Sequence, residues 1–381
     1  MWMRLLLKLL SNHIVLCAFA SGWLVNAASA DVTVVPPKVV DTITIGSGYG
    51  TYSVAVDHKA DRVYVANAEN STITVVDRKT DKMITTIAID DSHNIPGPFV
   101  SGPAQVLVDE DNSLLYVLTI NGTISVVDAN TYQVKSSFVF DSDAGGFEGL
   151  VTPYWAWSKK TGKLYVQNDN FRIDILDLKQ QKVIDYINDD QAGPLTINQR
   201  TNKIYISNAW NGTVWVINGD TDQVEDVISG VGIPESPPGC HVTGNCVVGG
   251  SGLNGVAVDE QLERLYVAGE DGRVVTIDTK TNKILSIKHN IPAFQITVNP
   301  VNHAVYVIDD ISATLSLIDG VSDKLVARNI SVGVGLGSST EFISPQNITV
   351  DPKSGRIYVA DFGLGGPDQV VVLNSYLVPG K

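Results

Sequence analysis

The stretch VAVDHKADRVYVANAENSTITVVDRKTDKMITTIAI, from Val54 to Ile89, decides the fold. It holds four β-branched apolar runs separated by three polar breaks, and we expect strands at Val54–Val56, Arg62–Ala66, Thr72–Val76 and Met83–Ile89. Short runs rich in Val, Ile and Thr, bounded by Asp, Asn and Lys clusters, are typical of strands. Because the runs are apolar at nearly every position, we expect both faces of these strands to be buried.

The same four-strand unit recurs along the chain. Its most regular feature is a tyrosine in the second strand, at Tyr64, Tyr116, Tyr165, Tyr205, Tyr266, Tyr306 and Tyr358. The third strand and the break after it recur as VVDRKTDK, VVDANTYQ, ILDLKQQK, VINGDTDQ, TIDTKTNK and LIDGVSDK. A four-stranded unit repeated about every 40–50 residues is typical of a β-propeller, in which each unit forms one blade. Seven tyrosines therefore predict seven blades.

The repeat words VYVAN, TITVVD and KMITTI resemble the YVTN-type repeats of secreted YncE-like and surface-layer propellers. The resemblance covers about residues 38–373 and implies an all-β propeller fold. It does not imply one activity, because related propellers include binding proteins, lactonases and lyases.

The last repeat lacks a fourth strand of its own, since the chain ends shortly after Val370–Leu373. The segment Lys38–Ile45, KVVDTITI, matches the fourth-strand pattern KMITTI that begins at Lys82. We expect this N-terminal strand to complete the seventh blade, which removes two open sheet edges and joins the ends of the ring. Residues 31–381 are then a single seven-bladed domain.

Residues 1–30 have the features of a secretory signal peptide. Arg4 and Lys8 give a basic start, Ile14–Val25 is an apolar core, and Ala28-Ser29-Ala30 is a small-residue cleavage site. We expect cleavage after Ala30 and a secreted or periplasmic protein, with an uncleaved anchor helix as the alternative. No later apolar run approaches the roughly 20 residues of a membrane span.

Cys240 and Cys246 are the two cysteines of the mature chain. In a secreted protein such a pair is expected to form a disulfide, which here would stiffen one loop. Closing so short a loop contributes about 2 kcal/mol in the chain-entropy model. A redox or metal-binding role is the alternative.

The mature chain is strongly acidic. Without Arg4 and Lys8 it has 41 acidic and 25 basic residues, which gives a net charge of −16. This balance argues against nucleic-acid binding, because phosphate contact requires a basic patch.

The long connections fall between the fourth strand of one repeat and the first strand of the next. In a propeller these connections share one face, here called the top, with the turns between second and third strands; the other turns form the bottom. Seventeen acidic residues and most phenylalanines fall in top segments, whereas acids and bases nearly balance in the bottom turns. Insertions on one face usually mark the binding face, although the aromatic residues could instead cover the core.

The first residues of the inner strands should line the top mouth of the channel. Counting back eleven residues from each tyrosine gives Ser53, Gln105, Tyr154, Pro194, Gly255, Gln295 and Asn347. Polar groups over an apolar wall suit a small-molecule site, and Trp210 is expected to join them. We therefore take Ser53, Gln105, Tyr154, Trp210, Gln295 and Asn347 as candidate ligand-binding residues; the alternative is that they cap strand ends and hold channel water.

A calcium site is a further candidate. Asp141, Asp143 and Glu148 lie in DSDAGGFE, which begins like a D-x-D-x-G calcium loop but lacks its later ligands. A solvated turn is the alternative.

Two classes of function follow from these features. The first is a binding propeller whose acidic, aromatic-rich top face takes a small ligand or a basic or amphipathic protein surface; we expect a monomer. The second is an enzyme that uses the channel mouth. Resemblance to lactonase-type propellers would imply a divalent metal held by Asn347 and nearby acids, and resemblance to lyase or cyclase propellers would imply an apolar substrate among Tyr154, Trp210 and Phe294. The sequence contains no catalytic signature that identifies catalytic residues for either.

Overall fold

The computed structural model describes residues 33–48, 50–90, 102–140, 154–167, 172–188, 192–208, 211–232, 252–269, 271–309, 311–333, 347–361 and 367–378. One compact unit covers Pro36–Ser375, and a second comprises Met1–Val35 with Tyr376–Lys381. The described residues contain no helix that is long and apolar enough to cross a membrane.

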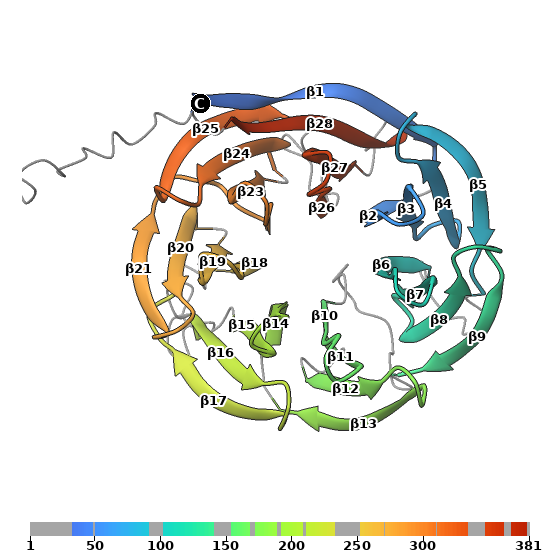
Figure 1. Ribbon diagram of the computed structural model, residues 1–381, viewed down its shortest axis with the longest axis horizontal. Helices are drawn as coiled ribbons and strands as arrows, with labels where there is room; N and C mark the ends of the chain where they lie inside the picture. Colours follow the sequence, from blue (N-terminus) through green and yellow to red (C-terminus); the bar gives the residue numbers. More distant parts are fainter. Residues whose placement is uncertain are drawn as a thin grey trace, which may run out of the picture. The chain divides into compact units, whose positions relative to one another are not determined.

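Within Pro36–Ser375, seven four-stranded antiparallel sheets stand around a central axis (Figure 1). The innermost strands are β2 (Thr51–Asp57), β6 (Pro103–Asp109), β10 (Trp155–Trp157), β14 (Ala192–Asn198), β18 (Leu253–Asp259), β22 (Gln295–Val298) and β26 (Asn347–Val350). The second strands are β3 (Arg62–Asn67), β7 (Leu114–Thr119), β11 (Lys163–Gln167), β15 (Lys203–Asn208), β19 (Arg264–Gly269), β23 (Ala304–Asp309) and β27 (Arg356–Asp361).

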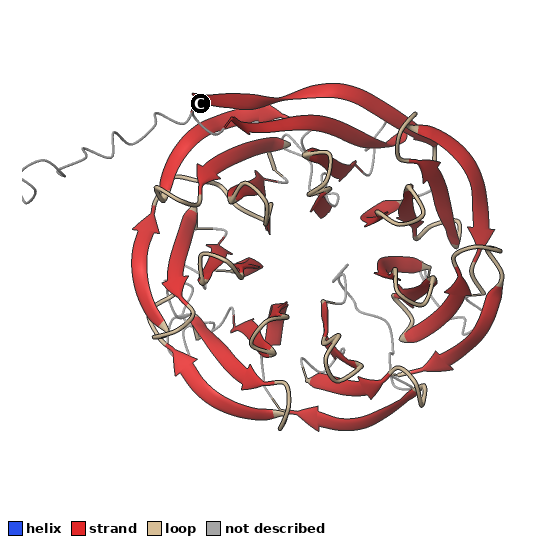
Figure 2. Cartoon of the chain, viewed as in Figure 1, coloured by secondary structure: helices blue, strands red, loops and turns tan. Residues whose placement is uncertain are grey.

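The third strands are β4 (Thr72–Asp77), β8 (Thr123–Asp128), β12 (Ile173–Asp177), β16 (Thr213–Asn218), β20 (Arg273–Asp278), β24 (Thr314–Asp319) and β28 (Asp368–Val378). The outer strands are β5 (Lys82–Ala88), β9 (Val134–Val139), β13 (Lys182–Ile187), β17 (Gln223–Ile228), β21 (Lys283–Lys288), β25 (Lys324–Ser331) and β1 (Thr33–Gly46). Blades 1 to 7 are numbered from β2 onward, and Figure 2 shows that strands and loops alone make up the described part of the ring.

The predicted closure is confirmed. The sheet of blade 7 has the order β1-β28-β27-β26, so the N-terminal strand lies beside the last strand of the chain. Ile43 and Ile45 of β1 are each 5% exposed and pack in one core cluster with Tyr358 and Val370. The apolar side of this strand therefore closes both the sheet and its core.

The four predicted strands of the first repeat are confirmed, but the burial prediction is wrong for the last of them. In β3 and β4 nearly every side chain is buried, whereas β5 exposes Met83 and Ile84. An outer strand has a neighbour on only one side and covers little of the adjacent blade. Its apolar residues therefore remain partly in solvent.

The bottom turns all follow one design. In the first, Asp57 Oδ1 accepts hydrogen bonds from the backbone N–H groups of Lys59 (2.9 Å) and Ala60 (2.7 Å), and Asp61 has φ of 55°. Asp, Asn or Ser opens each bottom turn among the described residues, and a residue with positive φ closes it four positions later. The recurring Asp-x-x-x-Asp/Asn words in the repeat thus encode a side-chain-capped turn rather than a site.

Charged side chains join blades 7 and 1 at the bottom. Arg78 of blade 1 forms ion pairs with Asp61 of its own blade and with the buried Asp351 of blade 7. Arg356 of blade 7 lies 2.7 Å from Asp81 of blade 1. These contacts reinforce the interface next to the closing strand.

Candidate functional site

The residues predicted to line the channel mouth occupy equivalent positions in the innermost strands of their blades. Ser53 is paired with Ala66 in the ladder, and Gln295 is paired with Ile308. The same relation holds for Gln105 with Leu118 and Asn347 with Ala360, and the carbonyl of Tyr154 accepts a 2.9 Å hydrogen bond from the N–H of Gln167. In each case the partner lies two residues after the repeat tyrosine, so the positions are structurally equivalent.

Two of these positions face the apolar cores between neighbouring blades. Tyr154 packs in the core between blades 3 and 4, against Ala156 and Tyr165. Ala55, on the same face of its strand as Ser53, packs in the core between blades 1 and 2. Residues that point into a blade interface are separated from one another by whole sheets.

Several candidates lie outside the described residues. Trp210, the calcium candidates Asp141, Asp143 and Glu148, and the cysteines Cys240 and Cys246 are all in this category. Among the residues that the structure does describe, no group of three or more His, Cys, Asp or Glu side chains is arranged to hold a metal ion.

Two buried hydroxyls mark the top of blade 1. Thr51 and Ser53 are 0% and 2% exposed, and neither side-chain oxygen has a hydrogen-bond partner among the described residues. The ladder shifts register between them, so that Tyr52 forms a bulge in the inner strand. The same shift occurs in the inner strands of blades 2, 4 and 5, so it belongs to the repeat, whereas unpaired buried polar atoms are costly.

Carboxylates from blades 1 and 7 lie close to Gly50, the residue before Thr51. Asp368, which is 3% exposed, accepts a 3.3 Å hydrogen bond from the N–H of Gly50. Glu69 packs so closely on Gly50 that a Cβ there would lie 2.6 Å from its Cγ. Partial desolvation, and then the negative charge of Asp368, raise the pKa of Glu69 above its usual value. Burial and the charge of Glu69 likewise raise the pKa of the Tyr52 hydroxyl.

The two described arginines of the top segments, Arg172 and Arg273, are already paired. Arg172 lies 2.8 Å from Asp174, and Arg273 lies 2.5 Å from Asp271. Each arginine therefore neutralises a carboxylate of its own blade.

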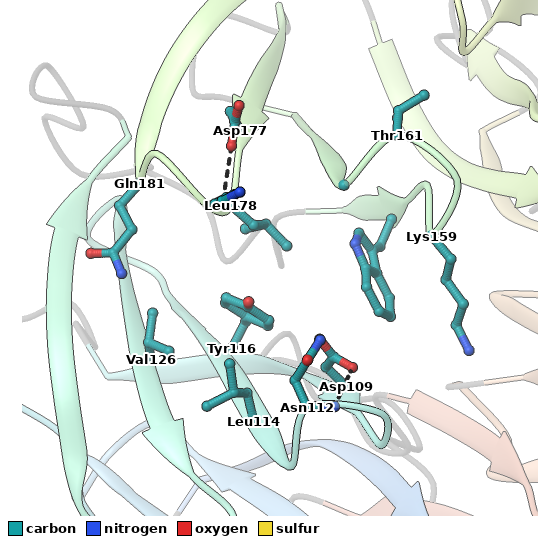
Figure 3. Close-up of a pocket in the computed structure, with 13 residues that line it drawn as sticks. Asp109, Asn112, Leu114, Tyr116, Val126, Lys159, Thr161, Asp177, Leu178 and Gln181 are labelled. Carbon is teal, nitrogen blue, oxygen red and sulfur yellow. Dashed lines mark hydrogen bonds between the residues drawn. The ribbon is translucent and has the colours of Figure 1, made fainter.

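A pocket that the sequence analysis missed lies on the bottom, between blades 2 and 3 (Figure 3). It has a volume of about 550 Å³ and is lined by Leu114, Tyr116, Trp157 and Leu178, among others. A second pocket of about 290 Å³ shares Trp157 and Lys159 with it and reaches inner strands of blades 2 to 4. The sequence signal was the pair Trp155 and Trp157, which replace aliphatic residues found at these positions in the other blades.

Comparison with curated proteins finds distant homologues. The chain is 21% identical over 303 residues to the uncharacterized protein YncE of Salmonella typhi, a match that covers 76% of this chain and 67% of that protein. It is also 21% identical over 296 residues to YncE of Escherichia coli K12, covering 74% and 65%. No family model matches the chain. The homology to YncE bears out the resemblance carried by the repeat words.

Solved structures show the same architecture at low sequence identity. The WD40 repeats of RRP9 superpose with a TM-score of 0.66 at 12% identity, covering 90% of this chain and all of that one. U3-55K superposes with a TM-score of 0.64, also at 12% identity, covering 89% and 100%. These likenesses establish the propeller fold alone.

Proposed function

We propose that this distant homologue of YncE is a secreted or periplasmic binding propeller whose top face takes a cationic, amphipathic ligand, either a small molecule or a basic protein surface. The observation that carries the proposal is the proximity of two like charges, Glu69 and Asp368, at Gly50, the residue before the unpaired hydroxyl of Thr51.

Electrostatics favour a cation at this place. Partial desolvation and repulsion by the negative charge of Asp368 raise the pKa of Glu69, whose side chain is exposed. A bound cation would relieve this repulsion. The acidic excess of the mature chain would also attract a cation over distances of about 10 Å at 0.1 M salt.

The hydroxyls supply the polar complement. A hydrogen-bonding ligand group that reached Thr51 or Ser53 would satisfy atoms that are buried without partners. The aromatic residues that the sequence places in top segments would supply apolar and cation–π contact, worth roughly 0.5–2 kcal/mol each.

Calorimetric titration with benzyltrimethylammonium, with benzyl alcohol as the neutral control, tests the proposal. We expect the cation to bind more tightly than the alcohol, and we expect its affinity to fall in 1 M salt, where the Debye length is about 3 Å. Affinity should also fall as the pH is lowered through the raised pKa of Glu69, because protonation removes the attracting charge.

Matched substitutions locate the binding. Glu69→Gln should weaken binding of the cation, whereas Asp111→Asn, an exposed acid in a bottom turn, should leave it unchanged. Equal affinity for the cation and the alcohol, or loss of binding in Asp111→Asn but not in Glu69→Gln, would overturn the proposal.

A further inference from the structure

On the bottom face, the interface of blades 2 and 3 lacks a contact that is present at four other interfaces. In four interfaces a basic residue at the start of the second strand reaches a bottom turn of the next blade. Lys163 pairs with Asp222, Arg356 with Asp81, and the remaining two contacts are Arg62 with Tyr132 and Arg264 with the carbonyl of Gly320. At the interface of blades 2 and 3 the two positions hold Leu114 and Gln181.

This exchange leaves space at the place where a long basic side chain lies in four other interfaces. Leu114 is shorter than arginine and cannot pair with Gln181, and both residues line the pocket of about 550 Å³. Of the seven repeat tyrosines, Tyr116 alone has measurable exposure, at 7% against 0% for the other six. Figure 3 shows its ring between Leu114 and Leu178. The tyrosine that is sealed in every other blade thus faces a pocket here.

The walls of the pocket are aromatic and aliphatic. Trp157 stands where the other blades have Val or Ile, and it packs in the core between blades 2 and 3 with Leu114 and Leu178. Its indole N–H is buried and has no acceptor among the described residues. A flat apolar ligand would find packing area against Trp157 and Tyr116, and an acceptor atom on that ligand could take the free N–H.

Two lysine side chains at the rim of the pocket are available to bind an anionic group. Its two carboxylates accept hydrogen bonds from the turns that they open. Asp109 accepts them from the backbone N–H groups of Asp111 and Asn112 and from the side chain of Asn112. Asp177 accepts them from the backbone N–H groups of Lys179 and Gln180 and from the side chain of Gln180. Lys159 and Lys179, by contrast, are exposed at the rim and form no ion pair within the described residues. Lys159 Nζ lies 5.5 Å from the centre of the Trp157 ring, so its positive charge is close to the aromatic side of the pocket.

We propose that this pocket is a second, separate binding site that takes a small planar aromatic carboxylate. Its ring would pack between Trp157 and Tyr116, and its carboxylate would meet Lys159 or Lys179 at the rim. The volume lies within the range of about 300–1,000 Å³ that is usual for small-molecule sites. The site is on the face opposite to the proposed top site and requires the opposite ligand charge, so the two proposals stand or fall independently.

Calorimetric titration of the full protein with 2-naphthoate is the test, with 2-naphthamide as the neutral analogue of the same shape. We expect 2-naphthoate to bind more tightly. The double substitution Lys159→Ala/Lys179→Ala should abolish this preference while leaving the fold intact, because both side chains are exposed. Lys160→Ala is the matched control, since Lys160 pairs with Asp220 and does not line the pocket.

A second substitution closes the pocket. Leu114→Arg/Gln181→Asp installs a charged pair like those at two other interfaces and should reduce the affinity for 2-naphthoate about two- to twelvefold, the loss expected when aromatic packing worth about 0.5–1.5 kcal/mol is removed. A melting temperature near that of the unmodified protein shows that the variant is folded. Absence of 2-naphthoate binding, equal affinity for naphthoate and naphthamide, or undiminished binding in the folded, closed variant would overturn the proposal.

Discussion

The residues with positive φ that close the bottom turns show how one backbone requirement is met by different side chains. Gly162 has φ of 72°, and a Cβ added there would meet nothing within 4 Å. Asn202 and Asn282 occupy the same turn position with φ of 55°. A side chain at position 162 would therefore be strained by the backbone conformation alone and not by steric contact with neighbouring atoms.

Substitution of Gly162 isolates that strain. Gly162→Ala should lower the free energy of unfolding by about 1 kcal/mol, because alanine disfavours the left-handed region. Gly162→Asn should cost less, since asparagine tolerates this region, as its use in the equivalent turns indicates. Guanidinium unfolding of both variants is the measurement. An alanine variant as stable as the asparagine variant would contradict this explanation of the turn.

At the scale of elements, the sequence predicted the fold well because the pattern repeats. Each blade carries its tyrosine, its apolar runs and its capped turns, and the words KVVDTITI and KMITTI alone indicate that β1 completes blade 7. The sites were harder to predict. Gly50 and Asp368 are 318 residues apart in sequence and meet only because the ring closes. The pocket depends on Leu114 and Trp157 departing from the repeat, which a comparison of the repeats with one another would have revealed.

The contact between blades 7 and 1 should make stability depend on acid pH. Burial alone would raise the pKa of Asp351, but hydrogen bonds from Ser354 and Arg78 outweigh it and hold the pKa below the unfolded value of 3.8. A carboxyl group with a lowered pKa stabilises the folded state above its unfolded pKa, and this contribution is lost as the pH falls through the folded pKa.

Asp351→Asn tests this linkage. The variant should be less stable than the unmodified protein near about pH 7, and the difference should shrink at about pH 3, where Asp351 becomes protonated on unfolding. Chemical unfolding at the two pH values measures it, with Asp111→Asn as the exposed control. A stability difference that stays constant between the two pH values would contradict the assignment.

The closing strand β1 should be essential to the whole ring. Deleting Asp31–Ile45 removes Ile43 and Ile45 from the core and opens the edge of β28, so we expect aggregation or gross loss of stability. Ile43→Ala, a milder change, should cost about 2–5 kcal/mol.

Val40→Ala is the matched control for the closing strand, because Val40 is exposed on the same strand. We expect it to change the guanidinium midpoint only slightly. A deletion variant that melts like the full protein, or equal effects of the two alanine substitutions, would contradict closure by this strand.

Across the whole molecule, the two faces differ in how their charged and polar groups are paired. In the bottom turns, charged side chains cap the turns or form ion pairs with neighbouring side chains, apart from the pocket between blades 2 and 3. The top of blades 1 and 7 instead holds two buried hydroxyls that have no hydrogen-bond partner among the described residues, and two carboxylates of like charge, Glu69 and Asp368. Closure of the ring by β1 brings Gly50 of blade 1 and Asp368 of blade 7 together, so the proposed site depends on closure.

Hydrogen–deuterium exchange with and without saturating benzyltrimethylammonium tests whether a cationic ligand binds at the top of blades 1 and 7. We expect slower exchange in peptides covering residues 50–54, 67–72 and 367–370 when the probe is bound, with no change in the bottom turns at residues 57–61 and 109–113. Protection of those bottom turns, or no protection at the top when the probe is bound, would contradict it.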